Sequence, residues 1–143
     1  MPDLLAAGAA LHAGFQLAVS ALVYPALADV PPERFAAAHD AHSRRITPLV
    51  GAVYLSVLAT SAPVVAAAVR GRRPSPHEVT AVAAQVLSLG TTAFVAAPLH
   101  GRLGRARSEQ DLRHLLRADR VRTAAAVVGL VAAVSARRAL PRN

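Results

Sequence analysis

Charged residues are missing from four stretches of this chain, and three of the stretches are long. Residues 4–28, 46–69 and 79–101 hold 25, 24 and 23 residues without Asp, Glu, Lys or Arg, and residues 123–136 hold 14. A helix of about 20 apolar residues, rising about 1.5 Å per residue, crosses the roughly 30 Å hydrocarbon layer of a bilayer. The fourth stretch reaches that length at 121–140, because arginines at span ends extend their charges to the interface.

The pattern therefore predicts an all-α protein with one domain, residues 1–143, that crosses the membrane four times. The expected spans are about 4–28, 46–69, 79–100 and 121–140. Residues 70–78 form a short turn containing Gly71, Pro74 and Pro76, which joins antiparallel helices. We expect an integral membrane four-helix bundle with up-down topology.

The other two connections carry helical patterns of their own. Apolar residues and histidines recur at steps of four and three after residue 33, which indicates a helical seam that runs into the second span. The seam consists of Phe35, His39, His42, Ile46, Leu49 and Val53. In the last connection, Ser108 precedes Asp111 by three residues, as in a helix N-cap, and an apolar face of leucines follows. We expect amphipathic helices in loops 1–2 and 3–4.

The two halves of the chain also resemble each other. Pro25 closes the first span and Pro98 closes the third, 73 residues later. This spacing raises the hypothesis of an ancient hairpin duplication.

The composition of the chain indicates which molecules surround the protein and which metal ligands it can offer. The chain has a net charge of +8, 16 basic residues that are all arginine, and no cysteine. The arginines flank apolar spans, so we expect anionic lipid headgroups as partners and no nucleic acid. Without thiolates, a metal ion would have to bind His, Asp or Glu. Small residues throughout the first span favour close helix contact, within one chain or in a homo-oligomer.

The distribution of arginines predicts the orientation. Ten arginines belong to loops 1–2 and 3–4 and their flanks, against six on the other side. The positive-inside rule then predicts a multi-pass protein of the cell membrane with these two loops in the cytoplasm.

Polar residues inside the spans form one candidate site. Counted from the cytoplasmic span ends, His12, Gln16, Tyr54 and Gln85 lie about 12 to 20 Å deep, in one layer. Lipid cannot satisfy their hydrogen bonds, so they should point into the bundle. These residues either form interhelical hydrogen bonds that hold the helices together, or they form a catalytic set in which His12, Gln16 and Tyr54 transfer protons.

A second candidate site lies at the cytoplasmic ends of the spans. His39, His42 and His100 fall there together and would hold a metal ion. Arg45, Asp119 and Arg122 would bind the polar group of a substrate. In the alternative interpretation, the histidines hydrogen-bond to Asp119, Tyr24 or lipid headgroups, and Arg122 pairs with Asp119 on its own helix turn.

One segment supports a resemblance to a known family. The run Pro98-Leu99-His100-Gly101-Arg102-Leu103, with the later run 115–123 that ends in Arg122-Thr123, resembles the anthrone-oxygenase-like family of small four-span membrane proteins. Members tend to have asparagine where this chain has His100 and Asp119. The resemblance implies oxygen-dependent oxidation of aromatic polyketides for a few members and no assigned role for most.

Two classes of function therefore stay open. The first is a membrane oxidoreductase or oxygenase acting on an apolar aromatic or lipid-dissolved substrate, at either candidate site. The second is a non-catalytic membrane subunit or small-solute carrier whose buried polar residues are structural. The cofactor is not readable from the sequence beyond a metal ion bound by histidines.

Overall fold

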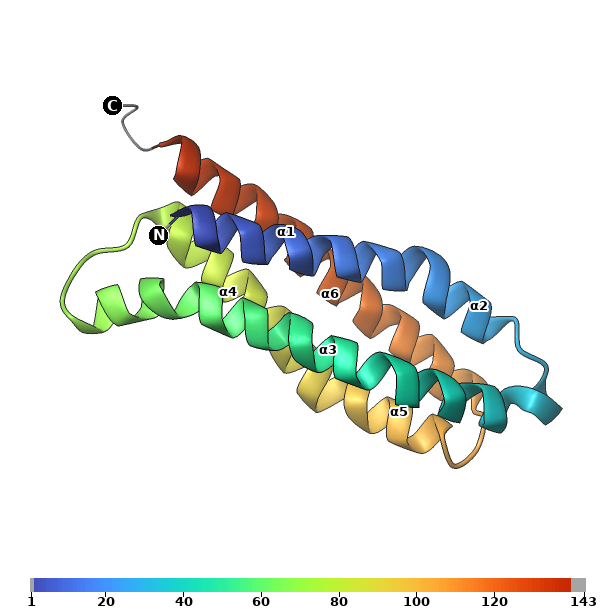
Figure 1. Ribbon diagram of the computed structural model, residues 1–143. Coiled ribbons are helices and arrows are strands. Elements are labelled where there is room, and N and C mark those ends of the chain that lie inside the picture. Colours follow the sequence, from blue (N-terminus) through green and yellow to red (C-terminus); the bar gives the residue numbers. More distant parts are fainter. Residues whose placement is uncertain (1, 140–143) are drawn as a thin grey trace.

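A computed structural model describes residues 2–139, and every regular element in that range is helical (Figure 1). The elements form four rods. They are α1 (Pro2–Ala18), η1 (Val19–Val23) and α2 (Tyr24–Ala28) in the first, α3 (Pro32–Val69) in the second, α4 (Pro76–Thr91), η2 (Thr92–Ala96) and α5 (Ala97–Leu103) in the third, and α6 (Glu109–Arg138) in the fourth. Successive rods run in opposite directions (Figure 1). The predicted all-α class is confirmed.

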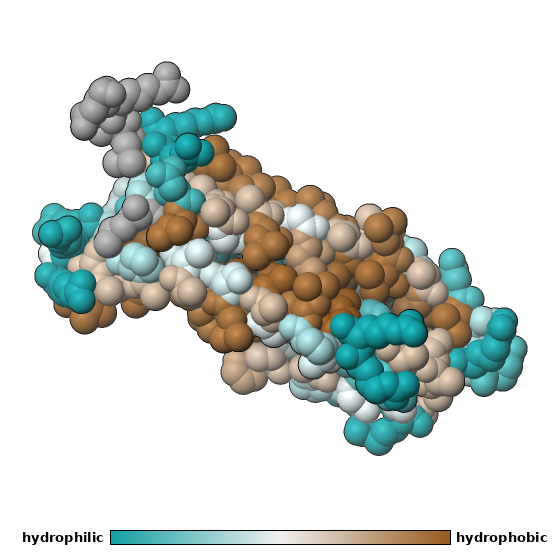
Figure 2. All heavy atoms as spheres, viewed as in Figure 1, coloured by the Kyte–Doolittle hydropathy of each residue, from teal (hydrophilic) through white to brown (hydrophobic). Residues whose placement is uncertain are grey.

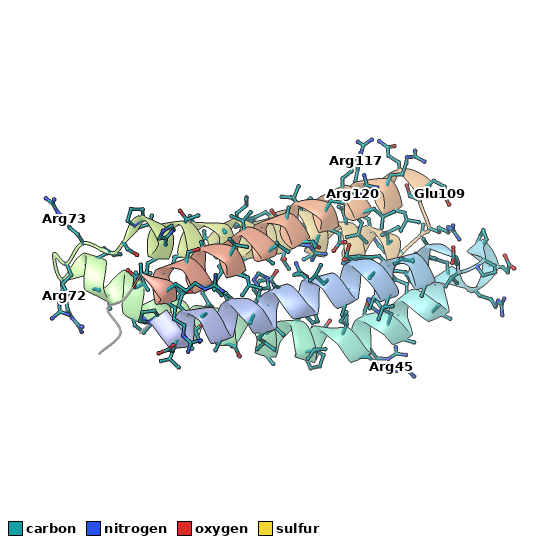
Figure 3. All side chains as sticks on the ribbon, turned by 90° about the horizontal axis from the view of Figure 1, so that it is seen from above. Arg45, Arg72, Arg73, Glu109, Arg117 and Arg120 are labelled. Atoms are coloured by element: carbon teal, nitrogen blue, oxygen red, sulfur yellow. The ribbon has the colours of Figure 1, made fainter. Side chains whose placement is uncertain are left out.

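The surface has the distribution of polarity expected for a protein within a bilayer. Three rods, Pro2–Ala28, Pro32–Val69 and Pro76–Leu103, are long and apolar enough to cross a membrane. Figure 2 shows apolar residues over the middle of the visible face and hydrophilic residues at both ends. In Figure 3, Arg72 and Arg73 extend from one end, and Arg117 and Arg120 from the region of the other. These features indicate an integral membrane protein.

Helix α6 has one buried face, while its opposite face, with Val121, Val128 and Val131, is exposed. It packs along α1 and α4 through a face of small residues: Ala125, Ala126, Gly129, Ala132, Ala133 and Ala136 are all buried. A Cβ at Gly129 would lie 3.5 Å from the Ala81 carbonyl oxygen, so the backbones approach closely. Small residues allow such contact where lipid gives no hydrophobic driving force between helices. The charge-free stretch of this helix is short, and α6 is not among the three apolar rods.

The helical patterns predicted in the two connections belong to longer helices. Residues 33–45 run into the second span, as the seam predicted, because α3 continues without a break through Pro48 to Val69. Likewise, the leucine face after Ser108 belongs to α6 itself, and the Ser108 side chain accepts a hydrogen bond from the Asp111 amide at 3.2 Å as predicted. The two long connections therefore extend the helices beyond the apolar region.

The helical seam was predicted correctly except at one position. Phe35, His39 and Val53 are buried, whereas Leu49 is 53% exposed. Steps of four and three average 3.5 residues per turn, while an α-helix needs 3.6, so the buried face drifts along the helix. Val50, the next residue, lines the interior instead.

Each of the two rods that contain η1 and η2 widens into a π turn just before a proline. The turn η1 ends at Val23, two residues before Pro25, and η2 ends at Ala96, two residues before Pro98. Proline has no N–H and its ring collides with the carbonyl oxygen one turn back, and a wider turn relieves both effects. The two π turns are 73 residues apart, the spacing on which the duplication hypothesis rests.

The loops that join the rods at one end hold each other in place. Arg107 donates to the backbone oxygens of Val30 and Ala28 and lies over the Phe35 ring, 5.2 Å from its centroid. At the opposite end, Arg137 of α6 pairs with Asp3 of α1. The first contact fixes the entrance of α3 next to the end of α5, where the candidate site lies.

Candidate functional site

A cavity of about 550 Å³ opens between the rods at the end that carries loops 1–2 and 3–4. Ligand pockets in proteins commonly measure about 300–1,000 Å³. All four rods contribute to its walls. The lining includes Gln16 from α1, Tyr24 from α2, His42 and Tyr54 from α3, His100 from α5 and Arg122 from α6. Residues from η1 and η2 also face it, and π turns are frequent at functional sites.

A chain of hydrogen bonds crosses one wall of this cavity. Arg122 donates to the Tyr24 hydroxyl at 2.8 Å and to Asp119 at 3.1 Å. The Tyr24 hydroxyl lies 3.3 Å from His100 Nε2, and His100 Nδ1 lies 3.1 Å from His39 Nε2. His39 also stacks on Phe35, with ring centroids 5.7 Å apart. Residues from four helices are thus joined in one polar path.

Arg122 favours one direction for that chain, although the histidine contacts themselves allow either tautomer. A guanidinium can only donate, so the Tyr24 oxygen accepts from Arg122 and its hydrogen is free to be donated to His100 Nε2. Neutral His100 then carries its proton on Nδ1 and donates it to His39 Nε2. His39 in turn carries its proton on Nδ1. If each group passes its proton one step along, the chain can relay a proton between His39 and Tyr24.

His42 is the ring of this group that stays free. It lies 6.3 Å from His100, centroid to centroid, lines the cavity and makes no hydrogen bond within residues 2–139. The first part of α3 carries several charged side chains before Ile46, so it lies outside the hydrocarbon layer. There, burial lowers the pKa of both His42 and His39 from its usual value. A lowered pKa keeps His42 neutral near pH 7, with a lone pair available as a base.

A second polar group lines the deep part of the same cavity. The Tyr54 hydroxyl lies 2.6 Å from Thr92 Oγ1 and 3.3 Å from Ser88 Oγ. Ser88 Oγ also lies 3.2 Å from His12 Nε2, and Gln16 donates to it at 3.5 Å. Of this cluster, Gln16, Tyr54 and Thr92 face the cavity.

The structure brings His12, Gln16 and Tyr54 together, but through a residue that was not predicted. His12 was expected to bond to Gln16, Tyr54 or Gln85, and its hydrogen-bond partner is Ser88. Its ring contacts Tyr54 edge-on, with centroids 5.2 Å apart. Gln85 instead accepts from Ser61 at 2.5 Å. His12 is fully buried, and its Nδ1 has no partner in the described part of the chain.

The structure brings together only part of the site predicted at the cytoplasmic span ends. His39, His42 and His100 converge, and Arg122 pairs with Asp119, as in the alternative interpretation. Arg45 does not join them, because it is exposed and Figure 3 shows it on the outer side of α3. Asp119 lies behind Tyr24, next to a separate cavity of about 190 Å³. The bond expected between a histidine and Tyr24 is present.

The predicted metal site on His39, His42 and His100 does not match this arrangement. Within residues 2–139, no group of three or more His, Asp or Glu side chains is placed to hold a metal ion. Both nitrogens of His100 are engaged, one with Tyr24 and one with His39. The rings are nevertheless close enough that a rearrangement of side chains would let His42 and His100 share an ion, so a metal stays a prediction.

Several residues of the site were missed from the sequence. Ser88 and Thr92 are the main ones, and their spacing with Gln85 gives a signal that was available. Positions 85, 88 and 92 recur at steps of three and four, which places three polar residues on one face of an otherwise apolar helix.

Comparisons with protein-family models, with curated proteins and with solved structures found no match for this chain. The function must therefore be derived from the site.

Proposed function

We propose that the chain is a four-span protein of the cell membrane, oriented with loops 1–2 and 3–4 in the cytoplasm, that binds an apolar aromatic molecule and oxidises it. The observation that carries the proposal is the cavity at the span ends, which has apolar walls and a free imidazole, His42, beside a hydrogen-bonded proton path. An apolar substrate accumulates in the lipid of the membrane, next to such a cavity.

In this proposal His42 acts as the base. A hydroxyl-bearing ring in the cavity loses its proton to the neutral imidazole, and the resulting anion gives up electrons far more readily than the neutral molecule does. A positioned general base contributes about 10²–10⁴ in rate. The resemblance to the anthrone-oxygenase-like family implies dioxygen as the oxidant, which would accept two electrons and two protons from the substrate and leave as hydrogen peroxide.

The second candidate function is a non-catalytic membrane subunit or solute carrier. The deep cluster favours it, because bonds from Ser88 and Tyr54 link α1, α3 and α4 without needing a ligand. Such interhelical bonds contribute about 0.6 kcal/mol each in membrane proteins.

Oxygen uptake distinguishes the two candidates. Detergent-purified protein is supplied with anthrones and quinols in an oxygen electrode, and its metal content is measured in parallel. The oxidoreductase proposal expects uptake that His42→Phe slows by about 10²-fold, the loss expected for a general base. His114→Phe, which removes an exposed histidine, should leave the rate unchanged. Uptake at no more than the uncatalysed rate with every substrate would favour the structural role.

The pH profile provides a second check on the same assignment. The neutral form of His42 is the active one, and its pKa is lowered by burial. The acid limb of the rate should therefore fall below the usual histidine value of about 6.5. Protonation of the base causes the loss, so the rate rises with pH through that limb and stays level above it. An acid limb near or above that value would contradict the assignment.

A further inference from the structure

Three arginines lie on one exposed face of α6, in the part of the helix nearest loop 3–4. Arg113, Arg117 and Arg120 follow each other at steps of four and three, which places them within about 60° around the helix. All three are exposed, and Figure 3 shows Arg117 and Arg120 along the same stretch of α6. The helix therefore presents three guanidinium groups in one direction.

The charge of these three arginines is not neutralised by the described part of the chain, residues 2–139, where none of them forms an ion pair. The acidic residues of α6 each pair with another arginine: Glu109 with Arg107, Asp111 with Arg102 and Asp119 with Arg122. The exposed face of α6 therefore favours an anionic partner.

The same face becomes apolar one turn beyond Arg120. It continues, in line with the arginines, through four exposed side chains: Ala124, Val127, Val128 and Val131. Val131 follows Arg113 by 18 residues, or about five helix turns, so both ends of the stripe point the same way. A phospholipid presents the same order of groups, a charged phosphate at the interface and acyl chains in the hydrocarbon layer.

A small cavity borders the arginines on the side of α2. It measures about 190 Å³, and Arg120 forms part of its wall together with Ser20 and Leu116. A guanidinium and a hydroxyl both donate hydrogen bonds, and arginine binds phosphate oxygens with two of its N–H groups. Asp119 also lines this cavity, but its charge is paired with that of Arg122. The cavity thus offers a place for a phosphate beside the stripe.

We propose that this face of α6 binds an anionic phospholipid, with the phosphate at Arg117 and Arg120 and an acyl chain along the valines of the same face. The partner is a lipid rather than a soluble phosphate, because only a lipid also covers the apolar half of the stripe. The arginine count predicted anionic lipids around both cytoplasmic loops, and the proposal narrows that contact to one face of one helix. It rests on the membrane location of the chain and does not depend on the proposed oxidation.

Native mass spectrometry of the full chain, released from detergent micelles, tests the proposal with two lipids. Phosphatidylglycerol and phosphatidylcholine are chosen with the same acyl chains, so they differ in the net charge of the headgroup. An arginine near an anionic lipid surface contributes about a factor of five in affinity. We therefore expect the first phosphatidylglycerol to bind about tenfold or more tightly than the first phosphatidylcholine.

Two triple variants with the same loss of charge locate the site. Replacing Arg113, Arg117 and Arg120 together by Gln should remove most of the preference for phosphatidylglycerol. The matched control replaces Arg70, Arg72 and Arg73 by Gln, which are exposed at the opposite end of the bundle, and should keep the preference. All six side chains are exposed, so both variants should fold as the wild type does.

Three results would overturn the proposal. An equal loss of preference in both triple variants would show a general attraction between charges and no site on α6. A preference that is unchanged in the α6 variant would exclude these arginines. Displacement of phosphatidylglycerol by an equal concentration of glycerol phosphate would show a site for a soluble phosphate, in which the apolar half of the stripe has no part.

Discussion

At the scale of single residues, the site depends on one buried ion pair. Arg122 and Asp119 are 6% and 3% exposed, and Arg122 donates to Tyr24 at the start of the path through His100 and His39. The pair was the alternative interpretation of these two residues, which were also assigned to substrate binding, and it was drawn from their spacing of three on one helix turn.

Removing one partner of this pair should destabilise the bundle strongly. Arg122→Met leaves the Asp119 carboxylate buried without a cation, and we expect the free energy of unfolding to fall by about 3–5 kcal/mol. The double variant Arg122→Met with Asp119→Leu should recover most of the loss, since it buries no charge. Reversible unfolding in mixed detergent micelles measures both. A double variant as unstable as the single one would contradict this interpretation.

Sequence reasoning failed at residues whose partner depends on tertiary contact. A serine in an apolar helix often bonds to a carbonyl of its own preceding turn, as Ser56 and Ser135 do here, so its presence does not reveal an interhelical role. Ser88 looks the same in the sequence and instead contacts His12. The assignment of Arg45 to the site was wrong for another reason. Arg45 is six residues after His39 and so lies about 120° away around the helix, although both residues are near a span end.

At the scale of elements, the rods and their ends follow from the sequence more completely than the site does. Apolar length, the Ser108 cap and the glycine and proline turn after Val69 are local features, and each appears in the structure. The π turns were not predicted, because they result from fitting a proline into a helix that neighbouring rods hold in place.

Close contact between α1 and α3 gives a test at this scale. A Cβ added at Gly8 would overlap the Thr60 side chain, whereas one added at Gly14 would meet nothing within 4 Å. We expect Gly8→Ala to lower the free energy of unfolding by about 1–3 kcal/mol through overpacking. Gly14→Ala, the matched control in the same helix, should be neutral or slightly stabilising. Equal effects of the two substitutions would contradict the packing described for α1 on α3.

At the scale of the whole molecule, the distribution of charge predicts how the protein sits in the membrane. Figure 2 shows hydrophilic residues at both ends of the visible face and apolar residues between them. The structure gives the topology of the rods, while the orientation rests on the arginine count alone. That count favours a cytoplasmic position for the end that carries the cavity.

Cysteine labelling tests the orientation cleanly because the chain has no cysteine of its own. Single cysteines at Ala36 and Ala106, both exposed, should react with a membrane-impermeant reagent only after cells are opened. A cysteine at His77, exposed at the opposite end, should react in intact cells. The reverse pattern would invert the topology and place the cavity on the outer side of the membrane.

Tyrosine fluorescence tests most directly whether the cavity binds an aromatic ring. The chain has two tyrosines and no tryptophan, and both tyrosines line the cavity, so its intrinsic fluorescence reports on this site. We expect para-naphthoquinone to quench the fluorescence saturably. Gly101→Leu, which places a side chain in the open space of the cavity wall, should weaken quenching about tenfold, while Gly51→Leu, equally open but outside the cavity, should bind as the wild type does. Quenching that rises linearly without saturation, and to the same extent in all three proteins, would contradict a binding site in this cavity.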